Sequence, residues 1–203
     1  MRSLIAVVLL CVSTFVDAAA IERFKAFAKG TQTARGSFEQ KVYDRDKRLT
    51  QESKGSFVFN RPGKFRWVYD KPVDQVIVGD GERVWIYDRG LAQVTVRKLS
   101  RALGSTPAAL LAGSADVEGV FELAEAGAKD GLEWLEAKPK DREAGFEKIR
   151  MGFAASGLHA MELSDNFGQT TLLRFIKLEV NAKVDAKEFR FELFKGADVL
   201  GEK

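Results

Sequence analysis

The side chains that most often perform catalysis are scarce in this chain of 203 residues. It contains one cysteine, Cys11, and one histidine, His159. A zinc cluster of Cys and His, a Cys–His nucleophile pair and a disulfide framework each need more of these residues. A single histidine on a strand-like run is usually structural or exposed to solvent. We therefore predict a protein that is not an enzyme and that holds no metal and no cofactor.

Neither of two groups of carboxylates predicts a functional site. Asp44 and Asp46 have a suitable spacing, but basic residues at positions 45, 47 and 48 surround them, and positive charge disfavours a bound cation. A charged turn between two strands explains them better. The pair Glu122 and Glu125 is too unspecific to indicate a site. The glycines near 81 and 168 lead into no helix, so they indicate turns and not a phosphate-binding loop.

Arg61 has a more informative position, because it comes directly before a Pro-Gly turn and a strand with Phe65 and Trp67 on one face. Two interpretations are open. Arg61 can be an exposed arginine of a turn. It can also lie at the mouth of a barrel, where its five N–H groups donate hydrogen bonds to carbonyl oxygens of a covering helix or loop.

The first twenty residues have the pattern of a cleavable signal peptide. A basic start at Arg2 precedes an apolar run from 4 to 16, and small residues occupy 18–20. The run is too short for a membrane span. We expect cleavage after Ala20, with Ala18 as the alternative, and so a signal peptide at 1–20 and a single domain at 21–203. Cys11 lies inside the apolar run, so the mature chain has no cysteine for a lipid anchor.

The positioning elements are mostly strands. Apolar residues at helical spacing predict a short helix from Ile21 to Ala28. A Thr-Pro start signal at 106–107 predicts further helix within 99–113. Elsewhere the apolar period is two, which predicts about ten strands and about three short helices in all. The strands are expected within 34–43, 57–59, 65–69, 73–78, 83–87, 120–124, 132–137, 146–153, 158–164, 170–180 and 188–194.

An antiparallel sheet of that size tends to curl. The chain is 45% hydrophobic with 15 Phe, so it can bury a large core, and its net charge of +3 gives no sign of nucleic-acid binding. Too few helices are predicted to form a complete second layer. We expect the helices at 21–28 and 99–113 to cover the concave face as a lid over an apolar hollow.

Four segments resemble the periplasmic outer-membrane lipoprotein carrier family, LolA. RPGKFRW at 61–67 is similar to the family's RPxxFxW signature, and VGDGERVWIY at 78–87 is similar to its DGxxxWxY hairpin. GSTP at 104–107 resembles the start of its lid helix, and DNFGQTT at 165–171 resembles its late DxxGQxT turn. The four occur in the family's order, behind a predicted signal peptide.

The resemblance implies a mainly β fold: an incomplete, unclosed antiparallel β-barrel of about eleven strands with an α-helical lid over an apolar cavity. It implies that Arg61 hydrogen-bonds the lid and holds it closed, together with Leu111 and Met161. The residues expected to line the acyl cavity or to dock partners are Phe57, Phe59, Phe65, Trp67, Trp85 and Leu110, with Phe65 matching a docking aromatic.

The implied function is that of a soluble chaperone in the periplasm of a Gram-negative bacterium, expected to be a monomer. It would take acylated lipoproteins from an inner-membrane ABC-type releasing complex and deliver them to an outer-membrane lipoprotein receptor. The alternative is an envelope module of the same fold that senses lipid or lipoprotein and reports to a partner. No nucleic-acid partner is expected.

Overall fold

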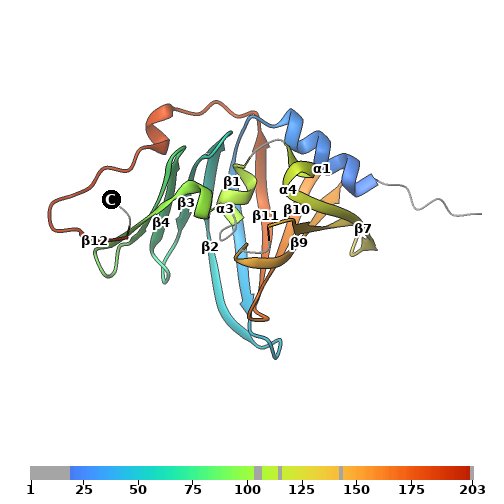
Figure 1. The fold of residues 1–203 in the computed structure, drawn as a ribbon, viewed down its shortest axis with the longest axis horizontal. Helices are drawn as coiled ribbons and strands as arrows, with labels where there is room; N and C mark the ends of the chain where they lie inside the picture. The colour runs from blue at the N-terminus through green and yellow to red at the C-terminus, as the bar shows by residue number, and fades with distance from the viewer. Residues whose placement is uncertain (1–18, 103–106, 114–115, 142–143, 202–203) are drawn as a thin grey trace, which may run out of the picture.

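The computed structural model describes residues 19–102, 107–113, 116–141 and 144–201. The predicted signal peptide, apart from Ala19 and Ala20, lies outside these residues, as does the helix cap expected at Thr106. A single sheet dominates the fold, and it curls so that its two ends form the two sides of the molecule in Figure 1.

The sheet has twelve strands among the described residues, in the spatial order β12-β6-β5-β4-β3-β2-β1-β11-β10-β9-β8-β7. All neighbours pair antiparallel except β12, which runs parallel to β6. The strands are β1 (Thr33–Tyr43), β2 (Leu49–Asn60), β3 (Lys64–Tyr69), β4 (Gln75–Asp80), β5 (Arg83–Asp88), β6 (Gln93–Lys98), β7 (Phe121–Lys129), β8 (Leu132–Pro139), β9 (Phe146–Ala154), β10 (Gly157–Asp165), β11 (Thr170–Val180) and β12 (Asp198–Gly201).

Short helices cover one face of this sheet. They are α1 (Ala19–Gly30), α2 (Leu99–Ala102), α3 (Pro107–Leu111) and α4 (Val117–Val120). The amphipathic α1 buries Phe24 and Ala28 and crosses strands β7 to β10, whereas α3 packs against β2 and β3. These helices and the inward side chains of the sheet form one buried apolar cluster. We call the face they cover the inner face.

The opposite, outer face of β2 to β6 is covered by the C-terminal segment. After β11 the chain crosses this face through a 3-10 helix, η1 (Ala186–Phe189), and reaches β12 at the far edge (Figure 1). Asp185 begins η1 with a capping box, in which its side chain and that of Glu188 bond reciprocally to backbone N–H groups. Phe189 is thereby buried against the sheet.

The fold class predicted from the sequence is confirmed, with corrections to single elements. The described residues hold twelve strands, close to the expected number of about eleven. The sequence did not predict strands β6 and β12. The strand predicted at 188–194 is wrong: its start forms the end of η1, and the rest runs outside every strand. Helix α1 is longer than the predicted 21–28.

Candidate functional site

Arg61 lies in the tight turn that connects β2 to β3. Gly63 completes the turn with φ of 75°, and a Cβ there would stand only 2.5 Å from the Leu99 side chain, so only glycine fits without strain. The Gly63 N–H donates to the carbonyl of Ala112, 2.7 Å away. The turn is therefore bonded to the residue that directly follows α3.

The Arg61 side chain joins two helices. Its Nε donates to the carbonyl of Leu111 at 2.9 Å and its Nη1 to the carbonyl of Ala28 at 2.5 Å. Both acceptors belong to the last turn of a helix, where carbonyls lack partners within the helix and carry the negative end of its dipole. The guanidinium also lies 5.2 Å from the ring centre of Phe27 and 5.3 Å from that of Phe59. Burial lowers the pKa of Arg61 to about 10, which leaves it charged at neutral pH.

Beneath Arg61 the inner face is filled by aromatic side chains. The indole of Trp67 lies between Phe38, at 4.4 Å between ring centres, and Phe57, at 5.0 Å. Phe59 and Phe65 continue the layer toward the turn, each at most 2% exposed. Strand alternation produces this arrangement, because residues two apart on β2 and on β3 point to the same side.

One polar interaction interrupts this layer, and the sequence analysis missed it. The Tyr69 hydroxyl donates to Gln40 Oε1 at 3.0 Å, and both side chains are only 7% exposed. Burial raises the pKa of Tyr69 to about 12, against the opposing effect of its neighbours Gln40 and Trp67. A glutamine between Phe38 and Val42 at an inward position of β1 was the available signal.

The predicted lid residues lie in two places. Leu111 is buried, and its carbonyl accepts the bond from Arg61. Leu110 is partly buried against the same core. Met161 is fully buried on β10, within the core under the helices and outside the set of groups that Arg61 bonds. Phe57, Phe59, Phe65 and Trp67 all lie on the inner face.

Comparisons with known proteins bear on the family and the fold of the chain. The family model of the outer membrane lipoprotein carrier protein LolA matches residues 29–192. An outer-membrane lipoprotein carrier protein of Nitrosospira multiformis is 49% identical over 186 residues, which are 91% of this chain and 90% of that protein. One of Methylobacillus flagellatus is 46% identical over 196 residues, 97% of this chain and 96% of that protein.

The chain belongs to the LolA family.

Solved structures support the same fold. A LolA superfamily protein of Nitrosomonas europaea covers 84% of this chain and 95% of its own, with a TM-score of 0.50 and 13% identity. An uncharacterized conserved protein of Thermus thermophilus covers 89% and 95%, with a TM-score of 0.53 and 12% identity. At such low identity these likenesses bear on the fold alone.

Trp85 does not join the other predicted cavity residues of this LolA-family chain. Its register on β5 turns it to the outer face, where the indole stacks on Phe191 at 5.4 Å between ring centres. Its N–H donates to Asp80 Oδ2 at 2.9 Å. Burial alone would raise the pKa of Asp80, but this bond and those from the backbone N–H groups of residues 82 and 83 hold it below its ordinary value.

His159 and Asp44 both lie beside turns of this LolA-family fold. His159 Nε2 lies 2.8 Å from the Ser156 hydroxyl at an exposed turn. Asp44 Oδ1 accepts from the backbone N–H groups of Asp46 and Arg48 and so stabilises the β1–β2 turn. In the described part of the chain no cluster of three or more metal-ligating side chains occurs. None of the helices described there is long and apolar enough to cross a membrane.

Proposed function

We propose that this chain carries acylated lipoproteins between membranes and shields their acyl chains on its inner face. The observation that carries the proposal is an aromatic interior covered by short helices, two of which are joined at their last turns by Arg61. Membership of the LolA family supports the cargo class. The role proposed is transport without catalysis.

The energetics of the cargo explain why a closable interior is needed. Burial of each CH₂ contributes about 0.8 kcal/mol. Transfer of an acyl chain of about 15 such groups from a membrane into water therefore costs roughly 12 kcal/mol of free energy. A carrier must offer a comparable apolar surface when it is loaded. An empty carrier with that surface exposed would aggregate. A cover that opens and closes satisfies both requirements.

We propose that Arg61 is the latch of that cover. Its two bonds join the last turns of α1 and α3 across the β2–β3 turn, so moving either helix away requires at least one of them to break. Hydrogen bonds to a charged group contribute about 1.5–3 kcal/mol each. That is the scale needed to bias an equilibrium between two states without locking it. Leu111 and Met161 add apolar contacts that the open state would lose.

The proposed partners are an inner-membrane ABC-type releasing complex, which loads the carrier, and an outer-membrane lipoprotein receptor, which unloads it. The chain's sequence shows no phosphate-binding loop, so energy for loading must come from the donor. Phe65 is the expected docking aromatic. It is 1% exposed when the cover is closed, so docking through it requires the cover to open first.

The proposed location is the periplasm, which the chain would reach by export across the inner membrane with removal of residues 1–20 as a signal peptide. The backbone N of Ile21 donates to Glu125 Oε1 at 2.9 Å. Cleavage after Ala20 would turn this nitrogen into a charged amino terminus that is already paired with a carboxylate. Cleavage after Ala18 would instead retain the first two residues of α1. The intact mass of the chain purified from the periplasm distinguishes the two.

Native mass spectrometry tests the carrier function. The purified mature chain is measured alone and after incubation with inner-membrane vesicles that contain lipoproteins, with and without ATP. We expect a one-to-one adduct with the mass of an acylated lipoprotein, formed only with ATP. An adduct with free lipid alone would support the lipid-sensing module of the same fold, and no adduct in either condition would contradict carriage.

A further inference from the structure

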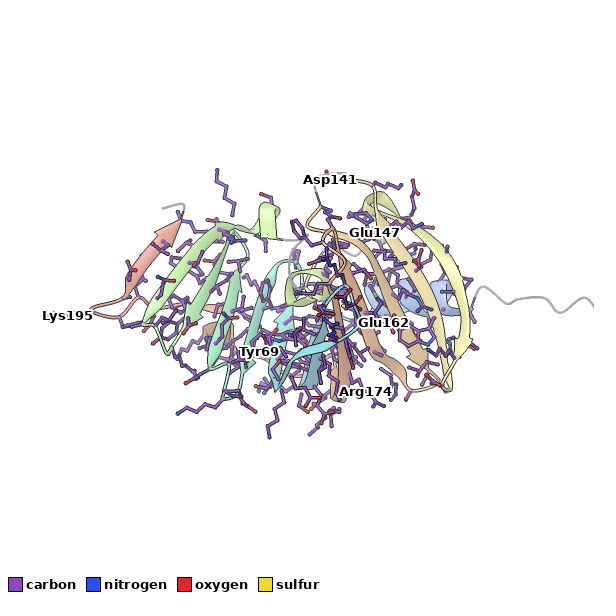
Figure 2. The ribbon with its side chains drawn as sticks, turned by 90° about the horizontal axis from the view of Figure 1, so that it is seen from below. Tyr69, Asp141, Glu147, Glu162, Arg174 and Lys195 are labelled. Atoms are coloured by element: carbon purple, nitrogen blue, oxygen red, sulfur yellow. The ribbon has the colours of Figure 1, made fainter. Side chains whose placement is uncertain are left out.

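A hollow of about 700 Å³ lies on the outer face of the sheet, under the C-terminal segment. Val76 of β4 and Tyr87 of β5, which are partners in the strand register, line it from the sheet. Residues between 187 and 194 line it from the other side, and in Figure 2 this segment reaches the edge of the molecule at Lys195. The interior proposed to hold acyl chains is on the opposite side of the same strands. We call this second space the outer hollow.

Aromatic rings form one wall of the outer hollow. The ring centre of Tyr87 lies 5.0 Å from that of Phe194 and 6.0 Å from that of Phe191. All three side chains line the hollow and none of them is buried, with Phe194 38% exposed. The fold therefore leaves apolar surface on this wall that a ligand can cover.

The outer hollow is also lined by more positive than negative charge. Its charged side chains are those of Arg66, Arg89, Lys187 and Arg190 and those of Glu188 and Glu192. Arg89 is paired with Asp74 at 3.1 Å, and Glu188 Oε1 with Arg35 at 3.0 Å. The other three cations form no ion pair with any residue that the structure describes, and neither does Glu192. Unpaired positive charge therefore exceeds unpaired negative charge in the outer hollow.

Arg66 is the one of these four cations that is not exposed. It is partly buried on β3, and its register partners on the neighbouring strands are Val58 and Val78, both buried. Its Nη1 donates to the carbonyl of Glu188 at 3.3 Å, which is the one hydrogen bond that its five N–H groups make to the described residues. A partly buried cation with unused donors and no carboxylate beside it is unfavourable. A bound anion would relieve this.

We propose that the outer hollow binds an amphipathic anion, an apolar chain that ends in a phosphate or a carboxylate. The anionic group binds to Arg66, because a planar guanidinium holds either group with two parallel hydrogen bonds, and Lys187 and Arg190 add positive charge. The apolar chain lies on Tyr87 and Phe194. The volume of the hollow is within the range of about 300–1,000 Å³ that small-molecule sites have. This proposal goes beyond the carrier function, because it concerns the opposite face of the sheet.

The indole N–H resonances of the mature chain can test this site, because tryptophans lie on both faces. Trp85 stacks on Phe191 beside the outer hollow, whereas Trp67 lies in the inner aromatic layer. The probes are dodecyl phosphate, dodecanoate and dodecyltrimethylammonium, which share one chain length and differ in the head group. Each is titrated below its critical micelle concentration. We expect the two anions to shift the Trp85 resonance in a saturable way and to bind about tenfold more tightly than the cation.

Variants locate the head group. Arg66→Gln removes the charge and keeps most of the apolar stem, so it should weaken binding of dodecyl phosphate at Trp85 by about tenfold. Arg190→Gln changes an exposed residue of the same hollow and should weaken it by about threefold. Phe194→Ala removes apolar contact alone, and should weaken all three probes by the same factor.

Arg174→Gln is the matched control. It removes the same charge from an exposed position on β11 that does not line the outer hollow and that is labelled in Figure 2. Salt screens a charge at such a position, so the affinity for dodecyl phosphate should change by less than about twofold.

The outcomes separate this proposal from the carrier function. A Trp85 resonance that neither anion shifts, or equal affinity for the anions and the cation, would overturn it. Affinity retained in both Arg66→Gln and Arg190→Gln would overturn it as well. Shifts of Trp67 alone would support the inner acyl-chain interior and contradict the outer site. Tighter binding of dodecyl phosphate than of dodecanoate would support a phospholipid as the source of the anion, and the reverse order would support a free fatty acid.

Discussion

The strands β2 to β5 have an apolar layer on each face, and the two layers are covered in different ways. On the inner face the aromatic rings are buried completely under helices that Arg61 ties to the sheet. On the outer face Trp85 and Tyr87 are half-buried under the C-terminal segment. That segment leaves a hollow of about 700 Å³ against β3 to β5.

We infer from this difference that the way a cover is attached, and not how apolar its surface is, determines which face opens in the proposed carrier. The outer cover is continuous with β11 at one end and pairs with β6 through β12 at the other. Removing it would break strand pairing. The inner cover at α3 is joined to the sheet by the Arg61 side chain and by one backbone bond from Gly63. Its release would break these bonds and expose the buried side chains of Leu111 and Ala112, but it would break no strand pairing.

Truncating one ring in each layer tests the comparison with the largest expected effect. Phe57→Ala removes a ring that is 4% exposed and packed on Trp67 and Phe175, and should lower the free energy of unfolding by about 3–5 kcal/mol. Phe191→Ala removes an outer ring that is only partly buried, and should lower the free energy of unfolding by about 1–2 kcal/mol. Urea denaturation of both variants measures the difference. Equal losses would show that the two layers are packed alike.

Breaking the latch tests the attachment itself. Arg61→Leu should speed hydrogen exchange at the Ala112 amide by about tenfold or more, because loss of the charged bonds to Leu111 and Ala28 frees α3. Exchange at the Asp198 amide, which lies at the start of β12 and donates to the carbonyl of Ala92, should be unaffected. With the proposed function, the variant should also retain cargo longer and hand it over more slowly.

Arg61→Lys is the matched control, because it keeps the charge but lacks the fork that serves two carbonyls at once. The rate of hydrogen exchange at the Ala112 amide in this variant should lie between the rates in wild type and in Arg61→Leu. Exchange at Ala112 that stays at the wild-type rate in both variants, or hand-over to an acceptor that stays as fast, would rule out the latch.

The smallest effect concerns Asp80, which holds Trp85 in the outer layer. Its pKa is below the ordinary value when folded, so its ionised form stabilises the fold above about pH 4 and that contribution is lost as pH falls through the folded pKa. Asp80→Asn should lower the free energy of unfolding at pH 7 by less than about 1 kcal/mol, since solvent screens this half-buried group. Urea titrations at pH 7 and at successively lower pH should show that the difference in free energy of unfolding between wild type and Asp80→Asn shrinks as the Asp80 carboxylate becomes protonated. A difference that is constant with pH would contradict a role for the ionised carboxylate. In a Trp85→Phe background, which lacks the indole donor, the loss caused by Asp80→Asn should be smaller.

The sequence predicted which side chains of β1 and β3 share the inner face, because apolar residues occupy every second position along these strands. It did not predict the direction of Trp85, since 84–87 is apolar at every position and alternation then indicates no face. The stretch at 190–194 shows a related limit. Arg190 has extended dihedrals, as a strand would, but the chain pairs with no strand there. Pairing is a non-local property, and local patterns do not determine it.

In the candidate site, too, the local sequence indicates some features, and others depend on contacts between distant residues. The turn at Arg61 could be inferred from Pro-Gly, but its acceptors on α1 and α3 come from residues 33 and 50 positions away. The polar pair of Gln40 and Tyr69 was visible as a polar residue in an inward phase. Tyr69 reaches Gln40 across Gly55, whose missing side chain matters only once three strands are placed together.

The short parallel strand β12 affects how copies of this protein behave beside one another. An unclosed sheet has two edges whose free N–H and C=O groups can recruit another chain. One edge here is β12, only 4 residues long, and the other is β7, where a bulge between Glu125 and Ala128 interrupts the register. Both are poor templates for strand addition. We therefore expect this open barrel to resist polymerisation at both of its edges.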